Sequence, residues 1–345
     1  MTDVTILGAG LSGLSAAYFL KQKGIEAQVL EARGRVGGRT HSVKSHNAVL
    51  DLGAAWIWPH HYNITALVKD LGITPYAQHK TGYNLFETPT EVQAFEPQAT
   101  NYPQRLPKGT QEICLRLAEI LVGQVRLNTR VIRLRQSKQS VQLTLTTGAV
   151  LGTQVLVIAV PPRVAAHTLT LIPALPETLQ QAQQQTHTWM GNSAKALVTY
   201  ERPFWRDRQL SGFAISYAGP LGELHDNSPE DASNGVIKGF FASIKSYKGS
   251  AEERKQNVIA QLTRLYGADA QTYLDYHDVA WWQSDLSSAP KDHVPLSEHP
   301  PYANLEFRKA YWDGKLYFIG SETAAVQGGY LDGAVESARR ITNLF

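Results

Sequence analysis

Cysteine is almost absent from this chain of 345 residues, which contains only Cys114. A single cysteine excludes an internal disulfide and a thiolate metal cluster, and it is compatible with a reducing cytoplasm. Long apolar runs are also missing, and the opening residues MTDVTILGAG lack the basic and apolar regions of a signal peptide. We therefore expect a cytoplasmic protein without a membrane anchor.

A strong excess of charge is missing as well. The chain has 33 lysines and arginines and 30 acidic residues, and its formal net charge of +3 gives no reason to expect nucleic acid or an anionic membrane as a partner. The composition, 43% hydrophobic and 18% charged, is that of a soluble globular protein. The length favours two domains over one, since single hydrophobic cores rarely exceed about 250–300 residues.

Patterns for metal and hydrolase chemistry are missing too. The side chains of His60 and His61 diverge because they are adjacent, and no H-x-x-x-H pair or carboxylate partner completes a metal site. The chain has no G-x-S-x-G elbow and no cysteine-nucleophile pattern. We therefore predict neither a metal centre nor a hydrolase.

The first thirty residues predict a βαβ unit. Apolar residues 4–7 indicate a short strand, and apolar residues at helical spacing over 14–20 indicate a helix. A second strand follows at residues 27–30. Units of this length and order carry the glycine-rich turn of dinucleotide-binding proteins.

Gly8, Gly10 and Gly13 form G-x-G-x-x-G at that turn, and Glu31 stands at the end of the second strand. The tight turn needs glycine, the pyrophosphate needs close backbone approach and a helix N-terminus, and the acid bonds the ribose hydroxyls. The pattern therefore predicts a dinucleotide site, the alternative being a glycine turn that serves only helix–strand packing. Glu31 disfavours NADP because its carboxylate would repel a 2′-phosphate.

The segment EARGRVGGRT, residues 31–40, combines basic residues with a glycine pair. A loop that returns beneath a cofactor's phosphates needs backbone without side chains and guanidinium groups for charge. The residues that suit this role are Arg33, Arg35, Gly37, Gly38 and Arg39. A solvated charge cluster and an RGG-type RNA segment are the alternatives, but such RNA segments are repetitive and this one occurs once. A second contact with one cofactor favours FAD over NAD.

Strand patterns further along the chain predict the rest of the fold. Residues 155–160 are continuously apolar, as in a strand buried on both faces, and they stop at a proline pair. The other predicted elements are half-covered antiparallel strands at 125–127 and 141–145, strands at 194–200, 213–217 and 235–244 with a loop at 219–234, a strand at 316–319 and a helix at 331–341. The fold class is therefore α/β: a Rossmann-like FAD-binding domain with an inserted antiparallel-sheet substrate domain. The predicted ranges are 1–75, 105–175 and 276–345 for the FAD-binding domain, and 76–104 and 176–275 for the substrate-binding domain.

The pattern E-x-x-x-R-x-G-G-R-T, together with the N-terminal glycines, resembles the flavin-containing amine oxidase superfamily, which includes monoamine oxidases, polyamine oxidases and L-amino acid oxidases. The resemblance runs over nearly the whole chain. Its other segments are residues 50–57, 155–162, 202–205, 318–323 and 329–334. It implies an FAD cofactor, with the segment around Gly53 beneath the flavin, Val131 on the adenine side and Glu322 near the ribityl and phosphate groups.

The last predicted helix begins near Leu331, after two glycines. The resemblance implies that this helix points at the isoalloxazine. Its unpaired N–H groups and the positive end of its dipole would favour negative charge on a reduced flavin. The alternative is a terminal helix that packs on the sheet and is only initiated by glycine.

Lys195 and Tyr330 are the residues that the resemblance places in the reaction. Lys195 shares a predicted strand face with Leu197 and Thr199, where an exposed lysine is common, but it matches the family's lysine that holds a water against flavin N5. A buried lysine loses its charge readily and can assist proton movement. Tyr330 matches one wall of the family's aromatic cage, the alternative being a core tyrosine at the start of the last helix.

Residues 282–291 resemble the segment that in monoamine oxidases ends with a flavin-bound cysteine beside a tyrosine. This chain has neither residue there. We therefore expect non-covalent FAD and a cage whose second wall is not a tyrosine. Trp56, Trp58 or Trp282 would supply that wall, unless these residues pack in the core.

The resemblance implies FAD-dependent oxidative deamination. A neutral amine would transfer a hydride equivalent to the flavin, water would hydrolyse the resulting imine to an aldehyde, and oxygen would reoxidise the flavin and form hydrogen peroxide. The partners are then a small-molecule amine and oxygen. No arginine matches a carboxylate anchor, so primary amines rank above amino acids. The alternatives are a flavin-dependent desaturase or oxidase of a C–C bond, against which Lys195 argues, and a non-catalytic FAD-binding protein.

Overall fold

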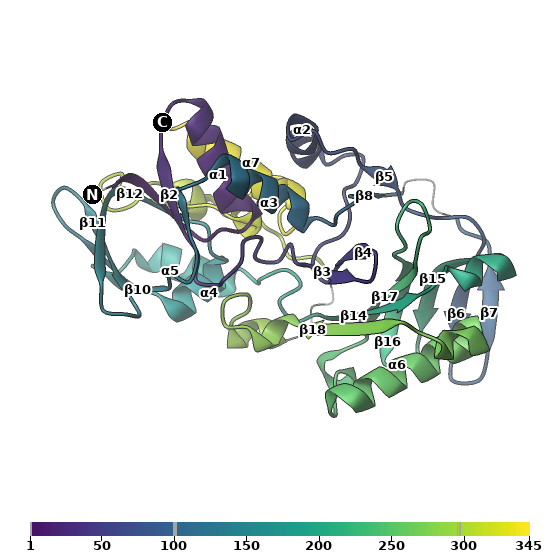
Figure 1. Ribbon diagram of the computed structural model, residues 1–345. Helices are drawn as coiled ribbons and strands as arrows, with labels where there is room; N and C mark the ends of the chain where they lie inside the picture. The colour runs from purple at the N-terminus through teal and green to yellow at the C-terminus, as the bar shows by residue number, and fades with distance from the viewer. Residues whose placement is uncertain (1, 99–101, 295, 297) are drawn as a thin grey trace.

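The protein has two lobes that lie side by side (Figure 1). The computed structural model describes residues 2–98, 102–294, 296 and 298–345. Both ends of the described chain lie in the first lobe. Within these ranges, no helix combines the length and the apolar character needed to cross a bilayer.

The first lobe is built on a sheet with the strand order β13-β10-β11-β12-β1-β2-β9, and β19 lies beside β12. Its strands are β1 (Thr2–Leu7), β2 (Ala27–Leu30), β9 (Val125–Arg126), β10 (Val131–Gln136), β11 (Val141–Leu145), β12 (Val150–Ile158), β13 (Thr170–Ile172) and β19 (Leu316–Phe318). β1 is parallel to both of its neighbours, β2 and β12. The first half of β12 pairs with antiparallel β11, and its second half pairs with parallel β19. The predicted βαβ unit is confirmed.

Helices cover both faces of this sheet (Figure 1). The helices on one face are α1 (Leu11–Gln22), α3 (Gln111–Ile120) and α7 (Leu331–Thr342), and those on the other are α4 (Pro162–Thr168) and α5 (Glu177–Gln185). Neighbouring side chains of β1 point to opposite faces, so Ile6 packs beneath α1 whereas Leu7 packs on the side of α4 and α5. β1 is therefore buried on both faces, as central parallel strands are.

The second lobe is built on a sheet with the order β18-β14-β17-β16-β15-β6-β7. Its strands are β6 (Tyr83–Glu87), β7 (Val92–Phe95), β14 (Ala194–Tyr200), β15 (Leu210–Ser216), β16 (Leu221–Asp226), β17 (Gly235–Phe241) and β18 (Asp275–Ala280). Helix α6 (Ala251–Tyr266) covers one face, where Ala196 packs against Leu262. On the opposite face, Leu197 packs against the hairpin of β3 (Ser42–Ser45) and β4 (Ala48–Asp51). That face therefore turns toward the first lobe.

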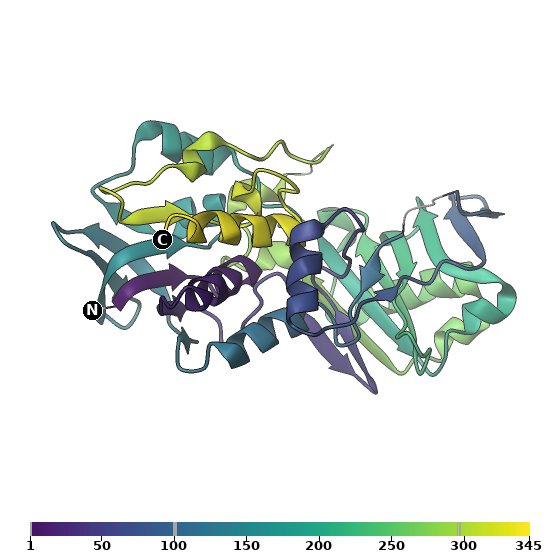
Figure 2. The ribbon, with the colours of Figure 1, turned by 90° about the horizontal axis from the view of Figure 1, so that it is seen from above.

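Helix α2 (Tyr62–Asp70) stands at the junction of the two lobes, beside the start of α7 (Figure 2). The short strands β5 (Tyr76–Ala77) and β8 (Gln104–Arg105) pair with each other near this junction (Figure 1). The carboxylate of Asp332 in α7 accepts hydrogen bonds from the Ile64 amide at 2.9 Å and from the Asn63 side chain at 3.1 Å. Asp332 thus caps the first turn of α2 and fixes α2 against α7.

The α/β fold class is confirmed, but three expected details are wrong. β9 is parallel to β2 and not antiparallel, because apolar–polar alternation in so short an edge strand does not encode its direction. β16 occupies the first part of the loop expected at 219–234, where Pro220 and Gly222 concealed the strand pattern. β6 pairs with β15 in parallel, so the second sheet is mixed and not purely antiparallel.

Candidate active site

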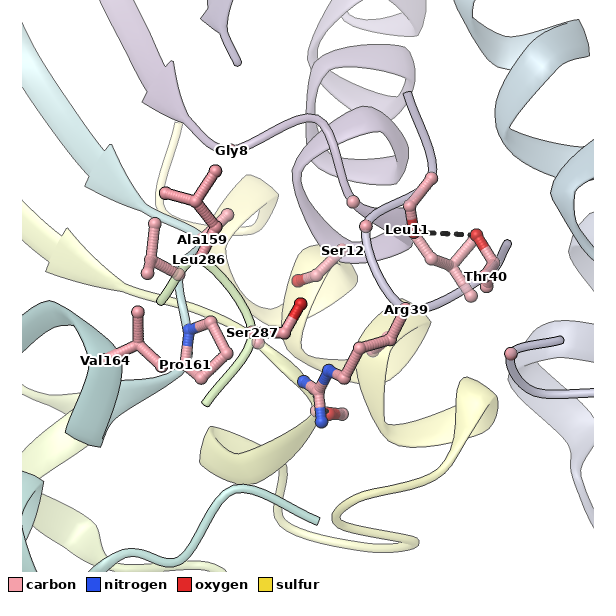
Figure 3. A pocket seen from close by; sticks show the side chains of 18 of the residues that line it. Gly8, Leu11, Ser12, Arg39, Thr40, Ala159, Pro161, Val164, Leu286 and Ser287 are labelled. Atoms are coloured by element: carbon pink, nitrogen blue, oxygen red, sulfur yellow. Dashed lines mark hydrogen bonds between the residues drawn. The ribbon is translucent and has the colours of Figure 1, made fainter. Parts of the chain in front are cut away.

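A cavity lies between the lobes and is lined by residues from both. It extends from the end of β1 to the inner face of the second sheet. Figure 3 shows its first-lobe end, where Ser12 and Ser287 point into the space between Arg39 and Pro161. The predicted site residues that line it are Gly8, Gly10, Glu31, Arg33, Gly38, Arg39, Gly53, Trp56, Trp58, Val131, Lys195, Glu322, Tyr330 and Leu331. Within the described ranges, no group of three or more histidine, cysteine or acidic side chains is placed to hold a metal ion.

The three glycines of the first turn have different physical roles. Gly8 has a φ of +111°, and a Cβ there would lie 3.1 Å from the Ala159 carbonyl oxygen, so the turn needs glycine. Gly13 does not line the cavity. A Cβ on Gly13 would lie 2.0 Å from the Gly8 carbonyl oxygen, so α1 can pack against the turn only because residue 13 is a glycine. Gly10 has an ordinary φ of −74°, and a Cβ there would meet no atom closer than 4.0 Å. A side chain at Gly10 would therefore occupy the cavity and not collide with the protein.

The second glycine loop lies against the first. The Gly37 amide donates to the Ala9 carbonyl at 2.8 Å, and an ideal Cβ on Gly38 would lie 3.5 Å from the Gly10 Cα. α1 begins at Leu11, so its first unpaired N–H groups also lie at this place. Backbone without side chains from two loops and a helix N-terminus therefore lie together, an arrangement that suits the predicted contact with a diphosphate.

Glu31 faces the cavity and also holds the turn. It is 4% exposed, and its two carboxylate oxygens accept from the backbone amides of Ala9 at 2.9 Å and Arg33 at 2.8 Å. Each oxygen keeps a second lone pair for a ligand hydroxyl. The position therefore fits the predicted contact with a ribose.

Arg39 is paired across the cavity with Glu322. Its guanidinium donates to both carboxylate oxygens, at 2.5 and 2.9 Å, and also to the Trp189 carbonyl at 3.1 Å. Burial alone would raise the pKa of Glu322, but the charge of Arg39 holds that pKa below its usual value. Glu322 is wholly buried and Arg39 is 27% exposed. Arg39 therefore joins the second glycine loop to the C-terminal segment and is not a free positive charge.

The other two arginines of residues 31–40 also have protein partners. Arg33 donates to the hydroxyls of Ser284 at 2.9 Å and Ser287 at 2.6 Å, and burial lowers its pKa. Arg35 lies outside the described cavity lining, and it donates to the carbonyls of Val36 and Gly38. Arg33 thus joins the loop to a distant segment, as Arg39 does, whereas Arg35 fixes the shape of the loop itself. The two serines were not identified in the sequence, because nothing local connects them with Arg33.

Lys195 lies on the buried inner face of β14 and lines the cavity. It is 5% exposed, so the alternative of a solvated lysine is wrong. Its Nζ donates to the Gly53 carbonyl at 2.8 Å, and burial lowers the pKa of Lys195 to about 8. Lys238, which the sequence did not single out, donates to the same carbonyl at 3.1 Å.

Aromatic side chains surround the end of the cavity near Lys195. They are Trp56, Trp58, Trp189, Phe240, Trp281 and Tyr330. Trp282 lies outside this lining. It is half-buried against the core of the second lobe, with its ring centroid 5.3 Å from that of Tyr247, which is the core-packing alternative. The 3-10 helix η4 (Trp281–Gln283) explains this, because it directs adjacent side chains to different sides. Trp189, from an irregular loop, was missed by the sequence patterns.

Tyr330 is the N-cap residue just before α7, and it lines the cavity. The ring centroids of Tyr330 and Trp189 are 6.4 Å apart, and an ideal Cβ on Gly329 (φ +80°) would lie 3.0 Å from the Trp189 Cβ. Gly329 is therefore needed for the close approach of the two rings. Leu331, the first residue of α7, also lines the cavity, so the positive end of the helix dipole faces it.

These features define the class of the protein, which is a two-lobed dinucleotide-binding fold. We call the part of the cavity formed by Gly8, Gly10, Glu31 and Gly38 the cradle. It opens into an aromatic chamber, which is the part lined by the six aromatic residues above and the buried Lys195. The family model of flavin-containing amine oxidoreductases matches residues 11–104 and 85–343. The chain belongs to this family, whose members are flavin-dependent oxidoreductases, and membership implies FAD as the cofactor.

Relatives and solved structures resemble the chain over nearly its whole length. It is 25% identical to a probable flavin-containing monoamine oxidase A of Dictyostelium discoideum, over 99% of this chain and 96% of that protein. It is 23% identical to the flavin-containing amine oxidase B of Sus scrofa, over 98% and 85% of the two chains. A putrescine oxidase bound to putrescine matches with a TM-score of 0.86 at 22% identity, over 99% and 98%. A cyclohexylamine oxidase of Brevibacterium oxydans matches with a TM-score of 0.86 at 18% identity, over the same shares.

Proposed function

We propose that the protein catalyses the FAD-dependent oxidative deamination of a small amine, with oxygen as the electron acceptor and hydrogen peroxide as a product. The observation that carries this proposal is that Lys195, buried and aromatic-flanked, lines the same cavity as the glycine cradle. A site that only stored a nucleotide would need neither a lysine of lowered pKa nor aromatic walls beyond the cradle.

The chain's own residues fit FAD at the cradle. Gly8, Gly10 and Gly38 leave backbone open to the diphosphate, and Glu31 has lone pairs for the ribose hydroxyls. Val131 lines the adenine end of this proposed site. When bound, FAD supplies a two-electron acceptor. Among the groups that tune it, the N-terminus of α7 would stabilise negative charge at the cavity.

The cofactor is proposed to be held without a covalent cysteinyl link. Cys114 is the only cysteine of the chain; it lies on α3 and is not part of the cavity lining. It is wholly buried beside the Thr40 hydroxyl at 3.3 Å, and burial raises the pKa of its thiol to about 12. A neutral thiol packed in the core is neither placed nor activated for attachment.

The aromatic chamber supports an amine with a small or apolar remainder. Tyr330 and Trp189 offer ring faces that attract an ammonium group on entry and pack against an alkyl chain. Each arginine of the described lining already has a protein partner: Arg33 with serines, Arg39 with Glu322 and Arg130 with Asp285. A substrate carboxylate would find no unpaired guanidinium there, so amines rank above amino acids. The putrescine held by a protein of this fold supports a small amine.

Lys195 is proposed to hold a water and to exchange protons with it. The lysine uses one N–H on the Gly53 carbonyl, and its other hydrogens remain for a water molecule. With a pKa of about 8, it exists in both charged and neutral forms near neutral pH. It can therefore accept a proton as the amine is oxidised and return one as the imine is hydrolysed.

A peroxide assay with a panel of primary amines, diamines and amino acids tests this function. The purified protein is expected to show flavin absorption bands, to lose them anaerobically with at least one primary amine, and to release peroxide in air. Flavin bands that no amine alters would contradict the proposal and favour oxidation of a C–C bond or cofactor binding without turnover.

A further inference from the structure

Lys238 is a second buried lysine beside Lys195. It lies on β17 directly opposite Leu197 of β14, so it shares the inner face of the sheet with Lys195. The side chain is 0% exposed and is not part of the described cavity lining. Both lysine Nζ atoms donate to the Gly53 carbonyl oxygen, at 2.8 Å from Lys195 and 3.1 Å from Lys238. The two nitrogens can therefore be no further apart than these two distances together.

Two aromatic rings lie close to the two amines. The Nζ of Lys238 is 5.1 Å from the Trp56 ring centroid and 5.9 Å from that of Phe240, and the Nζ of Lys195 is 5.0 Å from Phe240. Ring faces attract a cation but carry no net charge. They stabilise one ammonium group without removing the repulsion between two.

Negative charge near the pair is scarce. The titratable groups that face it, from its own sheet and from the elements packed on that sheet, are Glu223, His225, Asp275, His277, Asp51 and Arg105. The side chains of Glu223 and Asp275 are 54% and 35% exposed, so water screens their charges. Asp51 is therefore the carboxylate left for the two lysines and Arg105.

Asp51 cannot balance three cations. Arg105 is 3% exposed and always charged, and it donates to the Ser228 carbonyl and not to an acid. One oxygen of Asp51 accepts from Ser42 and Thr110, and the other has no hydrogen-bond partner among the described residues. One negative charge thus stands against a fixed guanidinium and two amines. Two protonated lysines would leave a large uncompensated charge in the interior.

The protonation of the two lysines follows from burial and proximity. Burial lowers the pKa of Lys195 to about 8. Burial, and then the charge of Lys195, lower the pKa of Lys238 well below its ordinary value. The two sites titrate as one coupled system, in which Lys238 loses its proton before Lys195 does.

We propose that Lys195 and Lys238 form a coupled amine pair that carries a single proton at neutral pH, with Lys238 as the positioning residue that sets the protonation of Lys195. The pair itself follows from the protein alone, whereas its use in catalysis rests on the proposed function. Because Lys238 stays neutral, Lys195 keeps its proton until about pH 8 and can then act on the substrate side of the cavity. A fixed charge in place of Lys238 would drive that proton off at lower pH.

Unfolding equilibria test the pair without any catalytic readout. The unfolding constants of the wild type and Lys238→Met are measured from pH 6.5 to 9, with Lys248→Met, an exposed lysine, as the control. Unfolded Lys238 binds a proton below about pH 10.4, and the neutral folded group does not. The ratio of the wild-type constant to that of Lys238→Met is therefore expected to fall about tenfold per pH unit. Lost packing alone would change this ratio by a constant factor, so a pH-independent ratio would overturn the proposal.

Anaerobic flavin reduction by benzylamine tests the coupling to Lys195. The comparison is between Lys238→Met and Lys238→Arg, which differ in charge at one position. The ionisation of Lys195 is identified as the step of the pH profile that disappears in Lys195→Met. The midpoint of this step is expected to lie at least about one pH unit lower in Lys238→Arg than in Lys238→Met. Equal midpoints would contradict the coupling. If no amine reduced the wild type, the proposed function would fail, but the ratio of unfolding constants would still test whether the two lysines share one proton. The same ratio tests this if the Lys238→Arg variant does not fold.

Discussion

Glu322 binds both terminal nitrogens of Arg39, at 2.5 and 2.9 Å, although the two residues stand 283 positions apart in the chain. This ion pair connects the loop after β2 with the segment before α7 at the wall of the cavity. The cofactor cradle is therefore assembled from the two ends of the sequence, and neither end forms it alone.

Glu322→Gln is predicted to destabilise the protein and weaken cofactor retention. The substitution keeps the shape of the side chain but leaves the Arg39 guanidinium without a counter-charge. Breaking a buried pair costs about 3–5 kcal/mol, and we expect the lower end because Arg39 is 27% exposed. Urea unfolding and flavin content after gel filtration measure the two effects.

The exposed pair of Arg202 and Asp207 provides a matched control for this prediction. Asp207→Asn removes a carboxylate in the same way but at the surface, where water replaces the lost partner. We expect no measurable change in stability or flavin content. An equal loss in both variants would remove the special role given to the Arg39–Glu322 pair.

Gly10→Ala is predicted to abolish cofactor binding while leaving the apoprotein folded. The added methyl group meets no protein atom closer than 4.0 Å, so the melting temperature without cofactor stays near that of the wild type. Gly13→Ala is the counterpart, because its methyl group would lie 2.0 Å from the Gly8 carbonyl oxygen and must destabilise the fold itself. Flavin titration and thermal unfolding of both apoproteins separate the two effects. Normal flavin affinity in Gly10→Ala would place the diphosphate elsewhere.

The rate of anaerobic flavin reduction is predicted to rise with pH through about 8 at saturating amine. Lys195 has a lowered pKa in the folded protein, so its neutral, proton-accepting form dominates above that pH and the charged form below it. Lys195→Met should remove this step from the profile and slow the reaction by at least about tenfold. A step that persists in Lys195→Met would assign the ionisation to another group.

Trp189→Ala is predicted to raise KM for an amine at least about tenfold with a smaller change in stability, since its ring lines the chamber beside Tyr330. Trp282→Ala is the matched control, because that ring packs against the core of the second lobe and does not line the chamber. We expect it to lower stability by about 2–4 kcal/mol and to leave KM unchanged. A raised KM in Trp282→Ala together with an unchanged KM in Trp189→Ala would show that Trp189 is not part of the wall that contacts the amine.

Local rules were enough to predict the first glycine turn and the acid beside it. Gly8, Gly13 and Glu31 are set by a strand, a turn and a helix that follow one another in the chain, so their contacts involve neighbours in sequence or adjacent parallel strands. The same is true of β14, whose bounds match the predicted strand at 194–200. The alternation of this strand also placed Lys195 on one face with Leu197.

Long-range contacts decided what the sequence did not reveal. Lys238 lies beside Lys195 only because of the register between β17 and β14. Trp189 lies near Tyr330 only because its loop folds back onto that residue. The partnership of Arg33 with Ser287 joins positions far apart, so no local pattern indicates it. The direction of a two-residue edge strand such as β9 is likewise fixed by its neighbour and not by its own residues.

The most direct test of the central claim is to denature the purified protein gently and identify by mass spectrometry what it releases. We predict one molecule of FAD for each chain and a polypeptide of unmodified mass. Release of a nicotinamide nucleotide, release of no nucleotide, or a flavin that stays attached to the chain would contradict the account.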